Sequence, residues 1–182
     1  MDKGFKIINQ KQLLNNPYMP VWVETCKSGN KTFDYFVLKG IRNSVSIVAF
    51  DRMGKLILVN VYRHGARKWF IEPIAGLVEK NEDYTKAAKR EMKEETGYSC
   101  GKLIKIGEGY SDPSRSIGKS MIYIATNCVK ISNQNLDDSE KLEVKLMEPK
   151  KVLEKLIKDK NANRWALHAF LLANKIKPEL FL

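Results

Sequence analysis

The sequence predicts one mixed α/β (α+β) domain with a small β-subdomain in front of it, and three observations support this fold class. The chain has 182 residues, of which 43% are hydrophobic, which suits a single domain with its own core. Two apolar, β-branched runs at 44–50 and 56–62 indicate buried strands. Residues 87–95 contain no helix breaker, and their Ala, Arg, Met, Lys and Glu all favour a helix.

Residues 1–43 are predicted to form the antiparallel β-subdomain. Pro17 and Pro20 mark a loop, and a short strand can follow at 21–23. A turn at 27–31, which contains glycine and asparagine, precedes a second strand at 33–38. Residues 44–182 are then expected to form the main domain, which begins with a buried hairpin turning at 51–54.

The later elements follow from hydrophobic periodicity. The expected strands are 68–72, 102–110, 120–127 and 142–147, and the expected helices are 149–158 and 164–175. Val144 and Leu146 alternate with charged neighbours, as in a strand with one buried face. The last helix has a largely apolar stripe that includes Trp165 and Leu171, so we assign these residues to packing.

A net charge of +11 is large for this length. It is compatible with nucleic-acid binding, with attraction of a phosphorylated small substrate, or simply with a lysine-rich composition. The lysines are spread from end to end without a block of five or six, which favours the last interpretation. We therefore do not expect a nucleic-acid partner.

Cysteine content and hydropathy limit the compartment. The three cysteines, Cys26, Cys100 and Cys128, are far apart and lack Cys-x-x-Cys spacing, so neither a disulfide scaffold nor a zinc site is expected. A reducing, cytoplasmic setting suits such a chain. No apolar run approaches the roughly 18 residues that suggest a membrane span, so no membrane partner is expected.

The predicted helix at 87–95 carries an acidic face. At about 100° per residue, Glu91, Glu94 and Glu95 fall within a sector of roughly 100°, and lysines lie on the other side. Carboxylates crowded on one face repel one another. A divalent cation with oxygen ligands, such as Mg²⁺, removes that repulsion. The alternative is a solvated helix with Glu–Lys pairs, but it does not explain the spacing of the wider segment.

The segment 76–98 resembles the complete Nudix box. Its fixed positions are Gly76, Glu82, Arg90, Glu91, Glu94, Glu95 and Gly97, with bulky residues at Met92 and Tyr98. Nudix enzymes hydrolyse a nucleoside diphosphate linked to another group, using Mg²⁺ or Mn²⁺. The resemblance implies the Nudix fold, in which mixed β-sheets are sandwiched between helices.

The stretch before the box resembles the ADP-ribose and nucleoside-diphosphate-sugar pyrophosphatase branch, which has a "Gln-Tyr-Arg … Glu-x-Pro-Ala-Gly" run. Tyr62, Arg63, Glu72, Ala75 and Gly76 match that run. Val61 replaces the glutamine, and Pro73 lies one position early. Pro113, 15 residues after Tyr98, also matches a proline of this branch.

The resemblance assigns roles to site residues. Metal ligands would be the Ala75 carbonyl, Glu91 and Glu95, with Glu94 nearby. Arg90, four residues before Glu94, would orient that carboxylate. In this family a glutamate of a mobile acidic loop acts as the general base, and alignment to the following strand selects Glu140. Asp138 is the second candidate, and Glu94 is a substitute.

Substrate contacts are assigned less narrowly. Arg63 would reach a phosphate, although it could also be an ordinary surface arginine. Arg115, in the loop after Pro113, is either a substrate contact or a solvated arginine. In this branch the leading β-subdomain pairs two subunits into a homodimer and helps to hold the base. The stacking aromatic would come from Tyr18, Trp22, Tyr35 or Phe36, each of which could instead pack in a core.

Three functions remain open from the sequence. The first is metal-dependent hydrolysis of ADP-ribose or another nucleoside-diphosphate sugar to a nucleoside monophosphate and a sugar phosphate. The second is hydrolysis of a different diphosphate, such as a dinucleoside polyphosphate or an RNA 5′ cap. The third is a non-catalytic nucleotide sensor on a Nudix fold. Such sensors usually lack some of the box glutamates, whereas this chain has all of them.

Overall fold

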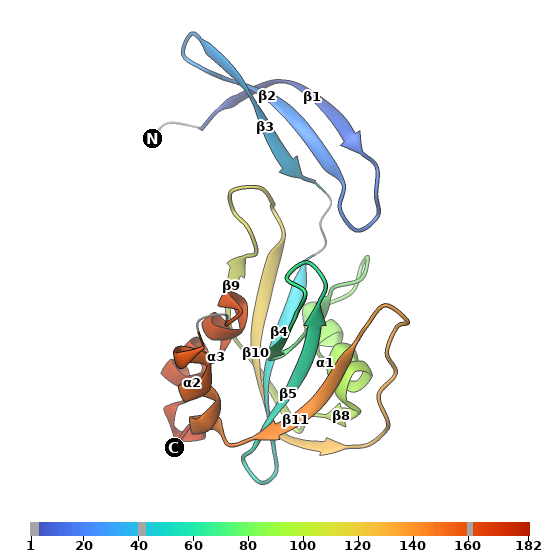
Figure 1. Ribbon diagram of the computed structural model, residues 1–182, viewed down its shortest axis with the longest axis vertical. Coiled ribbons are helices and arrows are strands. Elements are labelled where there is room, and N and C mark those ends of the chain that lie inside the picture. Colours follow the sequence, from blue (N-terminus) through green and yellow to red (C-terminus); the bar gives the residue numbers. More distant parts are fainter. Residues whose placement is uncertain (1–3, 40–42, 160–161) are drawn as a thin grey trace. The chain divides into compact units, whose positions relative to one another are not determined.

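The computed structural model describes residues 4–39, 43–159 and 162–182 (Figure 1). Its elements, in chain order, are β1 (Lys6–Leu14), β2 (Val21–Ser28), β3 (Lys31–Leu38), β4 (Ser44–Asp51), β5 (Leu56–Arg63), β6 (Lys68–Glu72), β7 (Ile74–Leu77), α1 (Tyr84–Thr96), β8 (Tyr98–Ser99), β9 (Lys102–Tyr110), β10 (Lys119–Lys130), β11 (Leu142–Met147), α2 (Pro149–Lys158), α3 (Arg164–Ile176) and the 3₁₀ turn η1 (Pro178–Leu180). The chain divides into two compact units, Met1–Asn43 with Gly109–Lys119, and Ser44–Glu108 with Ser120–Leu182.

The first unit contains a three-stranded antiparallel sheet in the order β1-β2-β3. The sequence pattern did not predict β1, and it predicted only the first three residues of β2. Every residue of β1 is exposed, so the strand lacks the alternation of buried and polar residues from which a strand is recognised. The loop at 111–118 belongs to this unit, where the Leu38 amide donates to the Arg115 carbonyl at 2.7 Å.

The second unit is built on a mixed sheet in the order β11-β5-β4-β10-β8. β4 and β10 run parallel, whereas β4 and β5 are antiparallel and pair only next to their hairpin turn, through Ala49 and Phe50. Beyond that point β6 pairs with β5 and β7 pairs with β4, so the two strands diverge. The chain passes from β5 through β6 and β7, which pair with the separated ends of β5 and β4, and then reaches the start of the acidic helix.

Helices cover both faces of this sheet, as Figure 1 shows. Residues on β4 and β5 alternate between the faces, so that Ile47 and Val59 pack with α1, and Val48 and Leu58 pack with α2 and α3. The α1 side of the core includes Val45, Ile57, Val61, Ala87, Ala88 and Met92, and the other side includes Phe50, Leu56, Ile124, Val152 and Phe170. The predicted α/β architecture, with mixed sheet between helices, is confirmed.

The second unit also contains the hairpin and the two C-terminal helices that hydrophobic periodicity predicted, each within one residue of the expected ends. Among the described residues, no helix has both the length and the apolar character needed to cross a membrane.

Candidate active site

Helix α1 carries the acidic face, and its two ends are capped. The Asp83 carboxylate accepts hydrogen bonds from the Thr85 and Lys86 amides at 2.8 and 3.2 Å, which satisfies the first turn. Gly97 ends the helix with a φ of 75°, and a Cβ at this position would lie 2.1 Å from the Ser132 carbonyl oxygen. Because the caps lie at 83 and 97, the helix is longer than the predicted 87–95.

Strand β7 lies directly against the acidic face. A Cβ at Gly76 would lie only 1.9 Å from the carboxyl carbon of Glu91, so the missing side chain makes room for that carboxylate. The Ala75 amide donates to Glu95 Oε2 at 3.2 Å. Ala75, Gly76, Glu91 and Glu95 are thus brought together, as a metal site formed by these residues requires.

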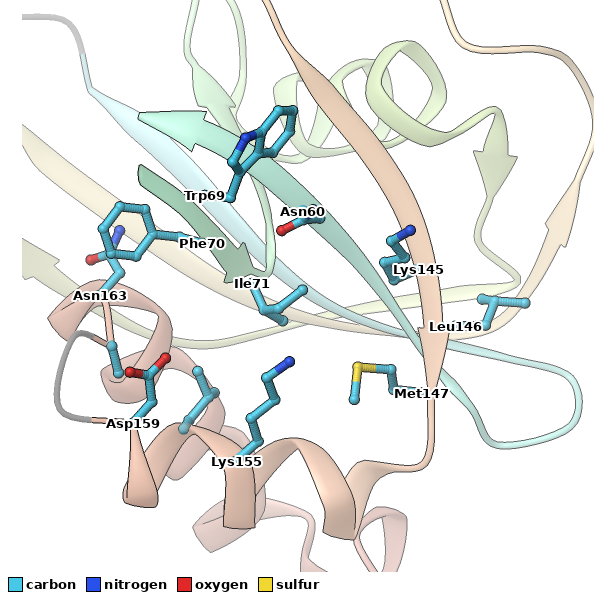
Figure 2. A pocket seen from close by; sticks show the side chains of 12 residues that line it. Asn60, Trp69, Phe70, Ile71, Lys145, Leu146, Met147, Lys155, Asp159 and Asn163 are labelled. Atoms are coloured by element: carbon cyan, nitrogen blue, oxygen red, sulfur yellow. The ribbon is translucent and has the colours of Figure 1, made fainter. Parts of the chain in front are cut away.

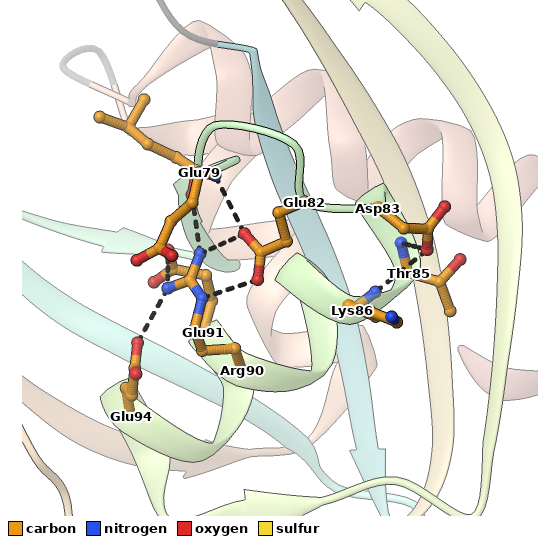
Figure 3. Close-up of polar contacts among 9 residues, drawn as sticks. Glu79, Glu82, Asp83, Thr85, Lys86, Arg90, Glu91 and Glu94 are labelled. Carbon is orange, nitrogen blue, oxygen red and sulfur yellow. Dashed lines mark hydrogen bonds and ion pairs between the residues drawn. The ribbon is translucent and has the colours of Figure 1, made fainter.

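Arg90 holds three of the box glutamates (Figure 3). Its Nε and Nη2 each lie 2.9 Å from an oxygen of Glu82, and its Nη1 lies 2.8 Å from Glu91 and 2.9 Å from Glu94. Nη2 also donates to the Leu77 carbonyl at 2.9 Å, which ties the helix to the end of β7. The hydrogen bonds that Arg90 donates to Glu82 are the main reason that the pKa of Arg90 is raised. Arg90 therefore stays charged and fixes the geometry of the acidic face.

The two innermost glutamates are buried. Glu91 is 9% exposed and Glu95 is 7% exposed. Burial raises the pKa of Glu91, against the effect of Arg90, and raises the pKa of Glu95 well above its ordinary value. The negative charge of Glu140 raises the pKa of both groups further. The ionised forms are therefore costly here unless a cation is close by.

A divalent metal fits this donor set. In the residues that the structure describes, no three His, Cys, Asp or Glu side chains already surround one point, because Glu91 and Glu94 contact Arg90 and Glu95 contacts the Ala75 amide. The available donors are nonetheless carboxylate and carbonyl oxygens, which Mg²⁺ and Mn²⁺ prefer. Burial disfavours the ionised forms of two of these carboxyls and so raises the pKa of each, and a bound cation would offset that cost.

An arginine–glutamate pair lies at the end of β5, next to this acidic cluster. Arg63 Nη2 lies 2.5 Å from Glu72 Oε2, and Arg63 Nε lies 3.2 Å from Glu72 Oε1. Glu72 is 4% exposed, whereas the Arg63 side chain is about half exposed. The pKa of Arg63 is raised mainly by Glu72, and the charges of Glu95 and Glu140 also raise it. Arg63 therefore lies within electrostatic reach of the acidic helix.

Glu140 lies in the exposed turn before β11. Its amide donates to the Asp137 carbonyl at 2.9 Å, and its carboxylate accepts from the Asp137 amide at 3.2 Å. The next carbonyl, that of Lys141, accepts from the Tyr62 amide at 2.9 Å, so the turn is tied to β5 beside Arg63. Asp138 is an exposed residue of the same turn. The second unit thus brings Arg63, Arg90, the box glutamates and Glu140 into one region.

The other predicted substrate contacts belong to the first unit. Lys39 Nζ lies 5.2 Å from the centre of a Trp22 ring, a cation–π contact. The Tyr35 hydroxyl donates to the Ser114 carbonyl at 2.6 Å and so anchors the 111–118 loop. The Arg115 side chain is exposed in that loop. Sequence reasoning did not single out Asn163, whose amide donates to Glu72 Oε1 at 2.7 Å.

Several known proteins are similar to this chain. The NUDIX domain family matches residues 40–170. The chain is 29% identical over 140 residues to the ADP-ribose pyrophosphatase of Bacillus subtilis (strain 168), which covers 76% of each protein. It is 32% identical over 98 residues to the methanol dehydrogenase activator of Bacillus methanolicus, which covers 53% of each.

A solved structure of an ADP compounds hydrolase superposes with a TM-score of 0.84, at 23% identity, and covers 96% of this chain and 95% of that one. This likeness shows a shared fold. The family match spans most of the chain, and the box glutamates lie together on a capped helix against β7. The protein therefore belongs to the Nudix hydrolase family.

Proposed function

We propose that the protein hydrolyses the pyrophosphate bond of ADP-ribose or another nucleoside-diphosphate sugar, giving a nucleoside monophosphate and a sugar phosphate. One observation carries the proposal: the buried carboxyl groups of Glu91 and Glu95 lie side by side within electrostatic reach of a half-exposed arginine. A metal ion held by these carboxylates, next to a guanidinium, would suit a substrate with two linked phosphates. The activity named for the Bacillus subtilis relative supports the choice of substrate class.

The proposed cofactor is Mg²⁺, with Mn²⁺ as a substitute, held by Glu91, Glu95 and the Ala75 carbonyl, with Glu94 nearby. When bound, such an ion neutralises phosphate charge and lowers the pKa of water. Arg63 binds a phosphate of the substrate, and its pair with Glu72 keeps the guanidinium at the end of β5. Glu140 accepts the proton of the attacking water, and Glu94 is the substitute base. Arg90 keeps the acidic face in place.

A substrate panel tests this proposal. The purified protein is assayed with ADP-ribose, a second nucleoside-diphosphate sugar, a dinucleoside polyphosphate and a capped RNA, with Mg²⁺ and with a chelator. We expect AMP and ribose phosphate from ADP-ribose, with a kcat/KM at least about tenfold above the last two substrates. A preference for the polyphosphate or the cap would overturn the substrate class. Binding without turnover of any compound would favour the sensor alternative.

We also propose that the β1–β2–β3 sheet pairs two copies of the protein and that Trp22, Tyr35 and Arg115 help to hold the nucleotide. Large hydrophobic side chains are exposed on this unit, including Phe5, Ile7, Ile8, Leu13, Leu14, Tyr18, Met19 and Phe36. Apolar exposure of this extent is typical of an interaction surface. Light scattering that gave the mass of one chain would contradict the homodimer. The three free cysteines suit the proposed cytoplasmic location.

Replacing Gly76 with alanine is expected to weaken Mn²⁺ binding by about tenfold to a hundredfold, as when a group that supports a metal ligand is removed. The new Cβ would overlap the Glu91 carboxylate and force it away from the other donors. Electron paramagnetic resonance of free Mn²⁺ measures the affinity. Gly65→Ala is the matched control, because a Cβ there meets nothing within 4 Å. Equal affinities in the two variants would contradict the assigned position of Glu91.

A further inference from the structure

Asn163, the residue just before α3, uses the two ends of its side-chain amide for two different contacts. Its Oδ1 accepts a hydrogen bond from the Trp165 amide at 2.9 Å and so caps α3. Its Nδ2 donates to Glu72 Oε1 at 2.7 Å. Asn163 and the β6 residues Phe70 and Ile71 line one pocket of the second unit, shown in Figure 2. One side chain therefore connects the C-terminal helix with strand β6.

The Glu72 carboxylate accepts hydrogen bonds from both Arg63 and Asn163. Two come from Arg63 and one from Asn163, and Oε1 accepts from both residues. Because Glu72 is almost fully buried, rotation of its carboxylate would leave a charged group without partners, which is costly. The Asn163 bond thus opposes rotation of Glu72, and a fixed Glu72 holds the Arg63 guanidinium in one orientation.

We infer that Asn163 is a positioning residue that acts through Glu72 to hold Arg63 ready for a substrate phosphate. The last step of this inference rests on the phosphate-binding role proposed for Arg63. Capping alone does not explain an amide at this position. Aspartate caps a helix as well as asparagine does and adds a favourable charge at the N-terminus. An aspartate here, however, would place a second carboxylate against Glu72 and would have no hydrogen to donate.

Asn163→Asp separates the two contacts. The capping oxygen remains, so α3 keeps its N-cap. The lost bond to buried Glu72 also costs stability, however, and the melting temperature is expected to fall by about 3–12 °C with cooperative unfolding retained. The bond to Glu72 is lost, and kcat/KM for ADP-ribose is expected to fall by about tenfold to a hundredfold, the value of a hydrogen bond to a charged group. Arg164→Gln is the control, because it changes the net charge equally at the next residue and leaves Asn163 intact. Its kcat/KM is expected to stay within about twofold.

A double-mutant cycle tests whether the effect runs through Arg63. In an Arg63→Ala background, Asn163→Asp is expected to change kcat/KM by less than about twofold, because the group that it positions is absent. A full additional loss in that background would overturn the inference. It would also be overturned if Arg63→Ala alone left kcat/KM unchanged.

A substrate-free measurement keeps this test independent of the proposed function. The Nε–H signal of Arg63, assigned by its loss in Arg63→Lys, reports the bond to Glu72 in a ¹⁵N NMR spectrum. We expect its solvent exchange to be at least about tenfold faster in Asn163→Asp than in Arg164→Gln. Equal exchange rates would overturn the positioning role. If exchange is faster in Asn163→Asp but the wild-type protein does not hydrolyse ADP-ribose, the result would support the positioning of Arg63 and contradict the proposed function.

Discussion

Replacing Glu95 with glutamine is expected to lower kcat/KM with Mg²⁺ by about 10²–10³-fold, because the loss of a charged ligand removes several kcal/mol of metal-derived stabilisation. Glu95 is the most deeply buried of the three clustered glutamates and contacts the Ala75 amide. A neutral amide keeps the size of the side chain and loses the charge that attracts the ion. The Mg²⁺ concentration that gives half-maximal activity is expected to rise. An unchanged Mg²⁺ dependence would contradict the ligand role.

The same substitution is expected to stabilise the metal-free protein at neutral and alkaline pH. The pKa of Glu95 in the folded protein is raised well above its ordinary value by burial. When the pKa of a carboxyl is higher in the folded than in the unfolded protein, ionisation of that carboxyl destabilises the fold. Its contribution to stability is fully present below the unfolded-state pKa and is lost as the pH rises through the folded-state pKa. Metal-free wild type therefore loses stability over that interval. Glu95→Gln does not titrate and avoids this loss.

Thermal unfolding in a chelator between pH 4 and pH 8 measures this effect. The melting temperature of Glu95→Gln is expected to exceed that of the wild type by an amount that grows with pH and is smallest near pH 4. Glu143→Gln is the matched control. Glu143 is exposed on β11, and Lys145 lowers its pKa. Ionised Glu143 therefore stabilises the fold, and Glu143→Gln is not expected to raise the melting temperature as the pH increases. A pH-independent difference for Glu95→Gln would show that burial of its charge is not the cause.

The acidic helix α1 could be predicted from sequence because its signals are local. Glu91, Glu94 and Glu95 share a face through helical periodicity, and Gly97 ends the helix through its positive φ. Strands β4 and β5 were likewise predictable, since their apolar runs have one or two buried faces, whereas the short strands β7 and β8 were not predicted. Strand β1 was not, because all of its residues are exposed and it forms only by pairing with β2.

Contacts between distant residues were beyond the sequence pattern. Asn163 and Glu72 are 91 positions apart, and no periodicity relates them. The pair of Arg90 with Glu94, four residues on, was expected and is present. The two hydrogen bonds from Arg90 to Glu82 were not expected, because they depend on how the loop before α1 returns to the helix. The choice among the aromatic residues of the first unit has the same difficulty, because it depends on which rings face a ligand and not on local spacing.

Replacing Glu140 with glutamine is expected to lower kcat by about 10²–10⁴-fold, the usual contribution of a general base. Substrate and metal affinities should change little. Glu140 raises the pKa of Glu91 and Glu95, so its neutralisation makes protons compete less with the metal for these two carboxylates. The same change removes one negative charge that attracts the metal. These two effects on metal binding oppose each other. Single-turnover kinetics and Mn²⁺ titration separate the chemical step from binding.

Asp138→Asn and Glu94→Gln complete this experiment, because each tests one alternative base. Asp138 is exposed in the same turn as Glu140, so Asp138→Asn changes the charge of the turn without removing the proposed base. Glu94 is partly exposed and held by Arg90, so Glu94→Gln is expected to disturb metal binding as well as kcat. A large fall in kcat for Asp138→Asn, with normal turnover in Glu140→Gln, would move the base by two residues. Normal turnover in both, with a fall confined to Glu94→Gln, would place the base on the helix itself, because only a carboxylate within reach of the attacking water can take its proton.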